Sequence, residues 1–104
     1  MNTLATLTPR LAVLAGLVER HPELPAPNVE ICSVFTDRIT MAFHDRPGAF
    51  RQWLTALGIA QHTVEGRAGG NTTWLTVLHE VDGITLKLTS YTRLAATVET
   101  GGEG

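Results

Sequence analysis

The chain has 104 residues, of which 43% are hydrophobic and 17% are charged, and its formal net charge is −2. This length allows one domain with a single modest core, and the ordinary apolar content excludes a largely disordered chain. The eight basic residues are scattered without a run, which argues against a protein that binds nucleic acid by neutralising phosphates. Cys32 is the only cysteine, so no disulfide can form within the chain.

A first helix is expected to begin at Thr8, a suitable N-cap, with Pro9 at the first helical position, where its missing N–H costs nothing. Apolar residues then recur at the i, i+3, i+4 and i+7 spacing of one helix face. They are Leu11, Leu14, Ala15 and Val18. We expect this stripe to pack against the rest of the domain. Pro22 ends the helix and begins a proline-rich connector.

Two strands are expected after this connector. Residues 28–35 are apolar on both faces, which favours a central strand with Cys32 as a small buried thiol. In residues 39–44 apolar and polar side chains alternate, as they do in a half-buried strand. The three residues between the two segments are few enough for a hairpin.

A second helix is expected over residues 48–57, with Gly58 as its stop. Its apolar stripe has the same spacing as that of the first helix. The stripe consists of Phe50, Trp53, Leu54 and Leu57. Beyond it we expect a strand at 61–65, a glycine-rich turn at 66–71, and two long strands joined by Asp82 and Gly83, a pair typical of tight hairpins.

The predicted order of elements is α-β-β-α-β-β-β. We expect an α+β two-layer sandwich in which two helices cover one face of a five-stranded, mostly antiparallel sheet. Residues 1–93 would form this single domain, and residues 94–104 a flexible tail. The sequence has no apolar run of membrane-spanning length and no convincing secretory signal, so we expect a cytoplasmic protein without membrane contact.

The junction between the second strand and the second helix has a recognisable pattern. Residues 39–59, "ITMAFHDRPGAFRQWLTALGI", resemble the opening of an ACT domain, the small amino-acid-binding regulatory module, in which a strand runs into Asp-x-Pro-Gly and then a helix. The resemblance implies a ligand site, where a glycine permits close approach and free helix N–H groups hold a carboxylate. That site would consist of Asp45, Arg46, Pro47 and Gly48. The alternative is that these residues only start a helix.

A second resemblance covers most of residues 11–90. The segments "LVERHPELPAP", "FRQWLTALGI" and "WLTVLHEVDGITLKL", in this order and spacing, resemble small uncharacterised α/β proteins encoded by actinobacteria, their phages and their mobile elements. This resemblance implies a genomic setting. It favours an accessory role, such as regulation of a host protein or of the element's own genes.

The residues with reactive side chains form no catalytic or metal-binding motif. The four histidines show no His-x-x-His spacing, and strand parity does not bring His44, His62 and His79 to one face. Their roles stay open. No nucleophile motif surrounds Cys32 or the serines. We therefore expect no metal, no cofactor and no enzymatic activity.

The last two strands present a second set of candidate residues. If their apolar residues point to the core, the alternate residues lie on the face away from the helices, where tryptophan and tyrosine on a threonine-rich surface are typical of interface anchors. The expected partner-binding residues are Trp74, Leu78, Glu80, Lys87 and Tyr91. The alternative is that the tail or the first helix covers Trp74.

Two functions therefore compete. The favoured one is a non-enzymatic binding or regulatory protein that contacts a host protein or a second copy of itself. The amino-acid sensor implied by the ACT resemblance is the alternative, and a small enzyme comes third.

Overall fold

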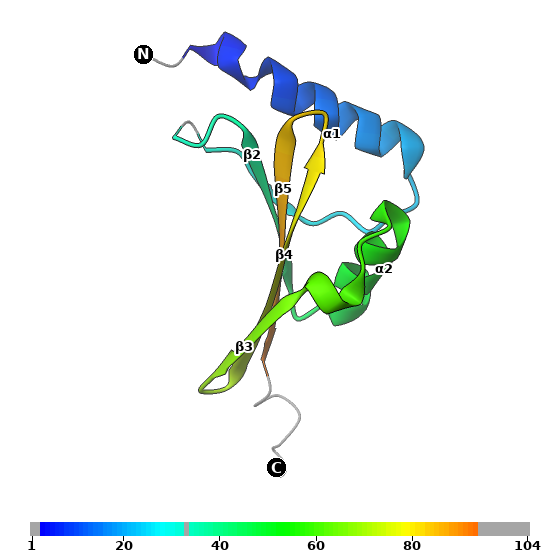
Figure 1. Ribbon diagram of the computed structural model, residues 1–104, viewed down its shortest axis with the longest axis vertical. Coiled ribbons are helices and arrows are strands. Elements are labelled where there is room, and N and C mark those ends of the chain that lie inside the picture. Colours follow the sequence, from blue (N-terminus) through cyan, green and yellow to red (C-terminus); the bar gives the residue numbers. More distant parts are fainter. Residues whose placement is uncertain (1–2, 33, 94–104) are drawn as a thin grey trace.

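The computed structural model describes residues 3–32 and 34–93 of the chain (Figure 1). In chain order its elements are the 3₁₀ helix η1 (Leu4–Leu7), α1 (Thr8–Arg20), β1 (Asn28–Glu30), β2 (Arg38–His44), α2 (Pro47–Leu57), the 3₁₀ helix η2 (Gln61–Thr63), β3 (Glu65–Gly69), β4 (Thr72–Val81) and β5 (Ile84–Arg93). The predicted α+β fold and its order of helices and strands are confirmed. The predicted tail, residues 94–104, lies outside the described residues.

The five strands form one mixed sheet in the order β1-β2-β5-β4-β3. β2 and β5 run parallel, and the other three neighbouring pairs are antiparallel. The tight turn between β4 and β5 is the predicted one, because Asp82 and Gly83 both have positive φ, at 51° and 82°. Positive φ at both central residues is the signature of a type I′ turn, whose twist matches that of the strands it joins.

One face of the sheet and the two helices together form the core. β2, β4 and β5 contribute alternate residues, as period-two strands do. These residues are Ile39, Met41, Phe43, Val77, Ile84, Leu86 and Leu88. α2 lies beside this face (Figure 1), and its stripe is buried as predicted, with the Phe50 ring edge-on to that of Phe43 at 5.9 Å between centroids. Gly58 ends α2 at a φ of 70°, which confirms the predicted stop.

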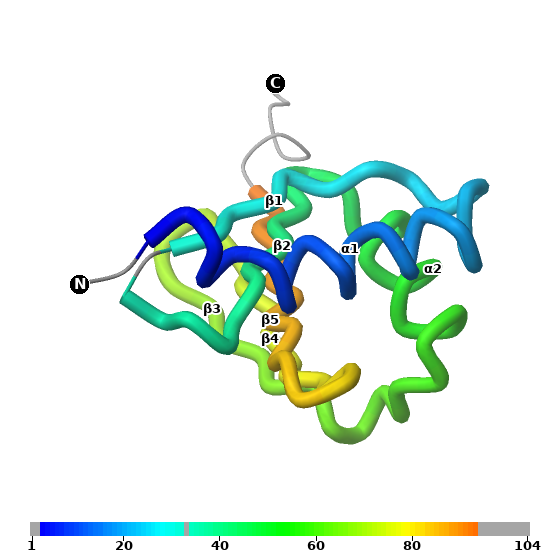
Figure 2. The backbone as a smooth tube through the Cα atoms, turned by 90° about the horizontal axis from the view of Figure 1, so that it is seen from above, coloured from blue at the N-terminus to red at the C-terminus, as the bar shows by residue number. Residues whose placement is uncertain are grey.

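α1 occupies a different position, because it crosses the end of the sheet instead of lying along its face (Figures 1 and 2). Its buried side consists of Arg10, Val13 and Leu17. The prediction that the stripe beginning at Leu11 faces the core is therefore wrong. Leu11 is 51% exposed and Val18 66% exposed, and only Leu14 of the four packs partly against the core.

Arg10 explains this rotation of α1. Its guanidinium is fully buried, and Nη1 donates to the carbonyl oxygens of Cys32 at 2.7 Å and of Phe35 at 3.1 Å. Within the described residues, Nε and Nη2 have no hydrogen-bond partner. A buried charge requires such partners, so the side of α1 that carries Arg10 must face this loop. Val13 and Leu17 follow on the same side and enter the core.

The same contact shortens the first strand. Only Asn28–Glu30 pair with β2, at the edge of the sheet, so the prediction of a central strand over residues 28–35 is wrong. The carbonyls of Cys32 and Phe35 bond to Arg10 instead of to a strand. Cys32 is exposed, which corrects the predicted buried thiol. The antiparallel pairing of β1 with β2 matches the predicted hairpin, although its connection is longer than three residues.

The glycine-rich segment 66–71 is largely a strand and not the predicted turn. β3 extends to Gly69, and only Gly70 and Asn71 lie between it and β4. The missing side chains make room for neighbours, since a Cβ on Gly66 would lie 3.3 Å from the Leu75 side chain and one on Gly69 would lie 3.1 Å from the Trp74 ring. β3 is thus an exposed edge strand in which Gly66 and Gly69 let side chains of β4 come close to the backbone.

Candidate functional site

The face of the sheet opposite the core has no described helix packed on it (Figure 1). Alternation along β4 and β5 places all five predicted partner-binding residues on this surface, which we call the open face. Its central residues are Trp74, Thr76, Leu78, Glu80, Thr85, Lys87, Thr89 and Tyr91, and His44 and Arg67 extend it onto β2 and β3. The predicted clustering of these side chains on one side is therefore found.

Four side chains form a row across the open face. The strand register aligns His44 on β2 with Tyr91 on β5, Tyr91 with Trp74 on β4, and Trp74 with Arg67 on β3. The His44 and Tyr91 rings are stacked, with centroids 4.9 Å apart and an interplanar angle of 14°. The Arg67 guanidinium lies 6.0 Å from the Trp74 ring centroid, at the limit of a cation–π contact.

A shallow depression of about 370 Å³ lies over β3, β4 and β5, and Trp74 and Tyr91 are among the residues that line it. Thr89 forms part of its lining and is only 4% exposed although it faces away from the core. The charged groups around the depression are Glu65, Arg67 and Lys87, so cations outnumber anions there. Trp74 and Tyr91 lie side by side, with the Thr76 and Thr89 hydroxyl groups at the next pair along the strands, so the lining can contact both apolar and polar groups of a bound molecule.

The remaining predicted residues of the open face differ in exposure. Leu78 is 58% exposed and Glu80 is exposed, whereas Trp74 and Tyr91 are half-buried. α1 does not cover Trp74, because it lies at the other end of β4, beside the turn to β5 (Figure 1). The alternative in which the first helix covers this ring is therefore wrong. The ring instead lies over Gly69 of β3.

His44 and Arg67 are not among the partner-binding residues that the sequence predicts. Strand parity correctly put His44 on the side opposite Phe43, but its position beside Tyr91 depends on the parallel pairing of β2 with β5. Arg67 lies in the segment 66–71, for which the sequence predicts a turn. Each of the four strands carries a polar or aromatic residue on the open face at the same register position. This pattern could have predicted the row once the strand order was known.

The junction at residues 44–48 is held by contacts within the chain. Asp45 has a φ of 56°, and its N–H donates to the carbonyl oxygen of Tyr91. Its carboxylate accepts a hydrogen bond of 2.9 Å from the Arg93 N–H and lies 3.4 Å from Arg93 Nε. The backbone hydrogen bond from Arg93, more than any other contact, lowers the pKa of Asp45 below its ordinary value of 3.8.

The neighbours of Asp45 position α2. Arg46 donates from Nη1 to the carbonyl oxygen of Ala26 at 2.9 Å and precedes the first residue of the helix, Pro47. Gly48 is exposed, and a Cβ there would meet nothing within 4 Å. Close backbone approach, the property that the ligand hypothesis assigns to Gly48, is therefore not required by any neighbour in the described structure.

The histidines are distributed over different parts of the molecule. His44 lies on the open face, His79 is half-buried on the core side of β4, and His62 is exposed in η2 and not in the predicted strand. Among the described residues, no group of three or more His, Cys, Asp or Glu side chains could hold a metal ion. None of the described helices is both long and apolar enough to cross a membrane.

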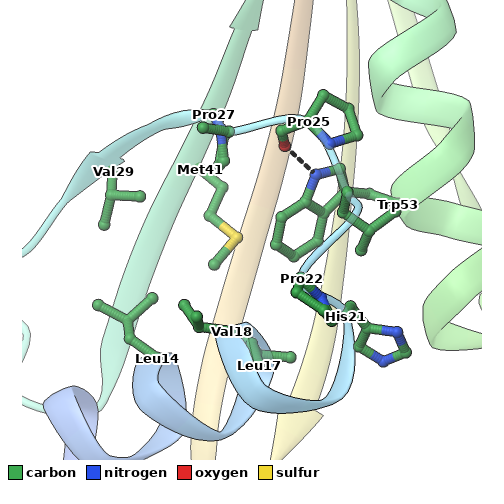
Figure 3. Close-up of a pocket in the computed structure, with 12 residues that line it drawn as sticks. Leu14, Leu17, Val18, His21, Pro22, Pro25, Pro27, Val29, Met41 and Trp53 are labelled. Atoms are coloured by element: carbon green, nitrogen blue, oxygen red, sulfur yellow. Dashed lines mark hydrogen bonds between the residues drawn. The ribbon is translucent and has the colours of Figure 1, made fainter.

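A second concave surface lies between α1, the proline-rich connector and β1. It has a volume of about 300 Å³ and a mostly apolar lining (Figure 3). Leu14 and Val18 of α1 line it on one side and Val29 of β1 on the other. The Trp53 indole N–H donates to the Pro25 carbonyl oxygen at 2.7 Å and ties the connector to α2. No sequence pattern predicts this groove, since its walls come from α1, the connector, β1, β2 and α2.

Comparison of the chain with family models, with curated proteins and with solved structures finds no match.

Proposed function

We propose that this protein is a non-enzymatic binding module that recognises another protein through its open face. The observation that carries the proposal is the row of His44, Tyr91, Trp74 and Arg67 across four strands, together with the depression that Trp74, Tyr91 and Arg67 help to line. Tryptophan, tyrosine and arginine are the residue types that dominate binding energy in protein interfaces.

The open face also favours a particular kind of partner. The Trp74 and Tyr91 rings in the depression offer a contact for one apolar or planar side chain, and Lys87 and Arg67 in its lining outnumber Glu65. A partner segment that presents an apolar side chain next to a carboxylate therefore fits best. Leu78, exposed further along β4, adds apolar area to the same contact.

The resemblance to proteins of actinobacteria, their phages and mobile elements favours a host protein as this partner. The module would then act in the cytoplasm by occupying or altering a surface of the host protein. Neither a cofactor nor a covalent step is part of this function.

The experiment captures partners from a lysate of the natural host with the tagged protein and identifies them by mass spectrometry. Binding of the purified partner is then measured for the wild type and for a Trp74→Ala, Tyr91→Ala variant. Loss of two interface anchors of this type is expected to weaken binding by about 30-fold or more. A Gln52→Ala, Thr55→Ala variant, altered at two exposed positions of α2, is the matched control and is expected to bind normally.

Thermal melts of the three proteins establish that the variants are folded. A partner that binds the folded Trp74→Ala, Tyr91→Ala variant as tightly as the wild type would overturn the proposal. Formation of a dimer that this variant loses would replace the host protein with a second copy of the chain.

A further inference from the structure

Strand β3 forms one border of the sheet (Figure 1). It pairs only with β4, and all 5 of its residues, Glu65–Gly69, are exposed. The backbone N–H and C=O groups on its outer side therefore face no other strand of the described chain. Such a row of unpaired groups is a template that another extended segment can join.

The two borders of the sheet differ in how well they are protected. β1 has 3 residues and follows Pro27, and natural sheets use very short edge strands and prolines to prevent further pairing. β3 is longer and contains no proline. Its charged residues, Glu65 and Arg67, both lie on the open face by strand alternation. The other side of β3 carries only Gly66 and Ala68, so it presents neither charge nor bulk to an added strand.

On that other side of β3, a hollow of about 370 Å³ is lined by residues of α2, β3 and β4. Its lining includes Arg51 and Leu54 of α2, Val64 just before β3, Gly66 and Leu75. Gly66 has no side chain to fill the hollow, and a Cβ there would lie 3.3 Å from the Leu75 side chain. The hollow can therefore take an apolar side chain from a strand placed outside Gly66.

An extended segment added to the outer side of β3 would contact both sides of the sheet. Paired strands lie about 4.8 Å apart, and successive side chains point to opposite faces. A residue opposite Gly66 would direct its side chain to the side of the hollow, and the adjacent residue, opposite Arg67, would lie on the open face. Two neighbouring residues of the segment therefore reach both positions.

The charges around these two positions favour an acidic residue in the segment. Arg51 lines the hollow and Arg67 lies on β3, whereas Glu65 is the one acidic residue of β3. Opposite charges on directly paired strand residues are stabilising, and like charges are destabilising. The segment that fits best thus has an apolar residue opposite Gly66 and an acidic neighbour opposite Arg67.

A second copy of β3 does not have these properties. It would bring only glycine and alanine to the side of the hollow and would leave the hollow unfilled. A different chain with a large apolar residue at this position fits better, because filling the hollow removes apolar area from water.

We propose that β3 and α2 form a groove that binds an extended segment of a partner protein by strand addition, with an apolar side chain in the hollow and an acidic side chain beside Arg67. The inference rests on the proposed function in one respect, that the partner is a protein. It adds a contact made by the β3 backbone to the side-chain contact of the open face.

The experiment titrates the isotope-labelled protein with the blocked peptide Thr-Val-Thr-Leu-Glu-Val-Thr and follows the backbone amides by NMR. The leucine and the glutamate of this peptide are neighbours, and its apolar residues share one side of an extended chain. The peptide is expected to slow hydrogen exchange of the outward amides of β3 by about 10-fold or more, because they gain acceptors. Replacement of the peptide leucine by serine is expected to raise the Kd by about 10-fold.

Backbone methylation of the peptide tests the strand addition itself. Successive N–H groups of a strand point to opposite sides, so only one of the leucine and glutamate N–H groups can donate to β3. A methyl group on that nitrogen is expected to weaken binding by about 10-fold or more, and a methyl group on the other is expected to leave binding unchanged. Equal effects of the two methyl groups would overturn the inference, as would absence of binding at millimolar peptide.

Charge reversal tests the position beside Arg67. Arg67→Glu is expected to weaken binding of the peptide by about three-fold or more and to strengthen binding of a peptide with lysine in place of glutamate. Arg20→Glu, which reverses an arginine on α1, is the matched control and is expected to bind like the wild type. Both arginines are exposed, so both variants are expected to keep the melting temperature of the wild type. A lysine peptide that does not prefer Arg67→Glu would contradict the proposed pairing.

Binding of the captured host protein separates this inference from the proposed function. Protection of β3 by the peptide, together with host-protein binding that survives Trp74→Ala, Tyr91→Ala, would support the groove and overturn the contact through the open face. Host-protein binding that requires Trp74 and Tyr91, together with a peptide that does not protect β3, would overturn the groove alone.

Discussion

Helices α1 and α2 carry apolar stripes of identical spacing, but the tertiary structure buries the stripe of α2 far more completely than that of α1. In α2 the stripe of Phe50, Trp53 and Leu54 is buried against the sheet. In α1 the residues at the ends of the stripe, Leu11 and Val18, are exposed. The comparison shows that periodicity identifies an apolar side of a helix without identifying the side that its own chain covers.

The two helices differ in how their ends are held. α2 follows β2 after only two residues, and Asp45 binds the end of β5 through its N–H and its carboxylate. This short connection leaves the helix one orientation against the sheet. α1 is joined to β1 by a connector of seven residues, 21–27, so its rotation is set by side-chain contacts, above all by buried Arg10.

The largest expected effect separates the two stripes directly. Leu54→Ala in α2 should lower the free energy of unfolding by about 2–5 kcal/mol, because the leucine is only 3% exposed and its removal leaves a cavity. Leu11→Ala, the same change in the α1 stripe, should cost about 0.5 kcal/mol or less at concentrations where the protein is monomeric. Urea denaturation measures both, and equal losses would show that the stripes are equally buried.

The second prediction concerns the residue that orients α1. Arg10→Ala should lower the free energy of unfolding by about 2–3 kcal/mol, because it removes two partly buried, charge-assisted hydrogen bonds to backbone carbonyls. Arg10→Met keeps most of the apolar stem of the side chain, so the difference between the two variants separates the contribution of packing from that of the hydrogen bonds. Hydrogen exchange should become faster in residues 34–37 of both variants. Unchanged exchange there would mean that Arg10 does not hold the loop.

A smaller effect distinguishes the ends of the two helices. Gly58 ends α2 with a φ of 70°, and its N–H donates to the carbonyl oxygens of Leu54 and Thr55. Gly58→Ala should therefore lower the free energy of unfolding by about 1 kcal/mol. His21 ends α1 at a negative φ of −135°, so His21→Ala should have little effect. Thermal melts of the two variants would contradict this view of the helix ends if their order were reversed.

The entry into α2 gives a pH-dependent prediction. The folded state lowers the pKa of Asp45 below 3.8, mainly through the backbone hydrogen bond from Arg93, so the carboxylate stabilises the fold at pH values above 3.8. This contribution is lost as the pH falls through the lowered pKa. Asp45→Asn tolerates the positive φ and removes only the charge. Its unfolding free energy should be slightly lower near neutral pH and should decline less steeply below pH 3.8.

The last prediction is of no effect, and it tests the alternative function, that of an amino-acid sensor. A panel of amino acids should leave the melting temperature unchanged, because the Asp45 carboxylate already binds Arg93 and Arg46 binds the Ala26 carbonyl. A shift produced by one amino acid and lost in Gly48→Leu would favour a ligand site at the start of α2.

Prediction from sequence succeeded where the cause of a structure is local. The type I′ turn needs positive φ at Asp82 and Gly83, and α2 ends at a glycine that accepts positive φ. It failed where a distant group decided the outcome. The length of β1 and the exposure of Cys32 depend on Arg10, which lies 22 residues earlier in the chain. The glycines of β3 are typical of a turn when only the local sequence is considered. They lie in a strand beside Trp74, whose ring approaches Gly69 from the neighbouring strand β4.

The same distinction between local and distant causes applies to the residues of the candidate site. Alternation along β4 and β5 was sufficient to place Trp74, Leu78, Lys87 and Tyr91 on one face, because a strand has a period of two whatever surrounds it. The row that includes His44 and Arg67 required the strand order β2-β5-β4-β3, which pairs segments far apart in the chain.

The sequence by itself therefore determined the order of the helices and strands and which side chains share a side of each helix and long strand, because these follow from backbone geometry and residue chemistry within a few positions. The tertiary structure alone decided which of the two apolar sides of α1 is buried, which strand lies at the edge, and which residues stand beside Trp74. Those outcomes depend on a buried guanidinium finding its carbonyl partners and on long-range strand pairing, and no local pattern encodes either one.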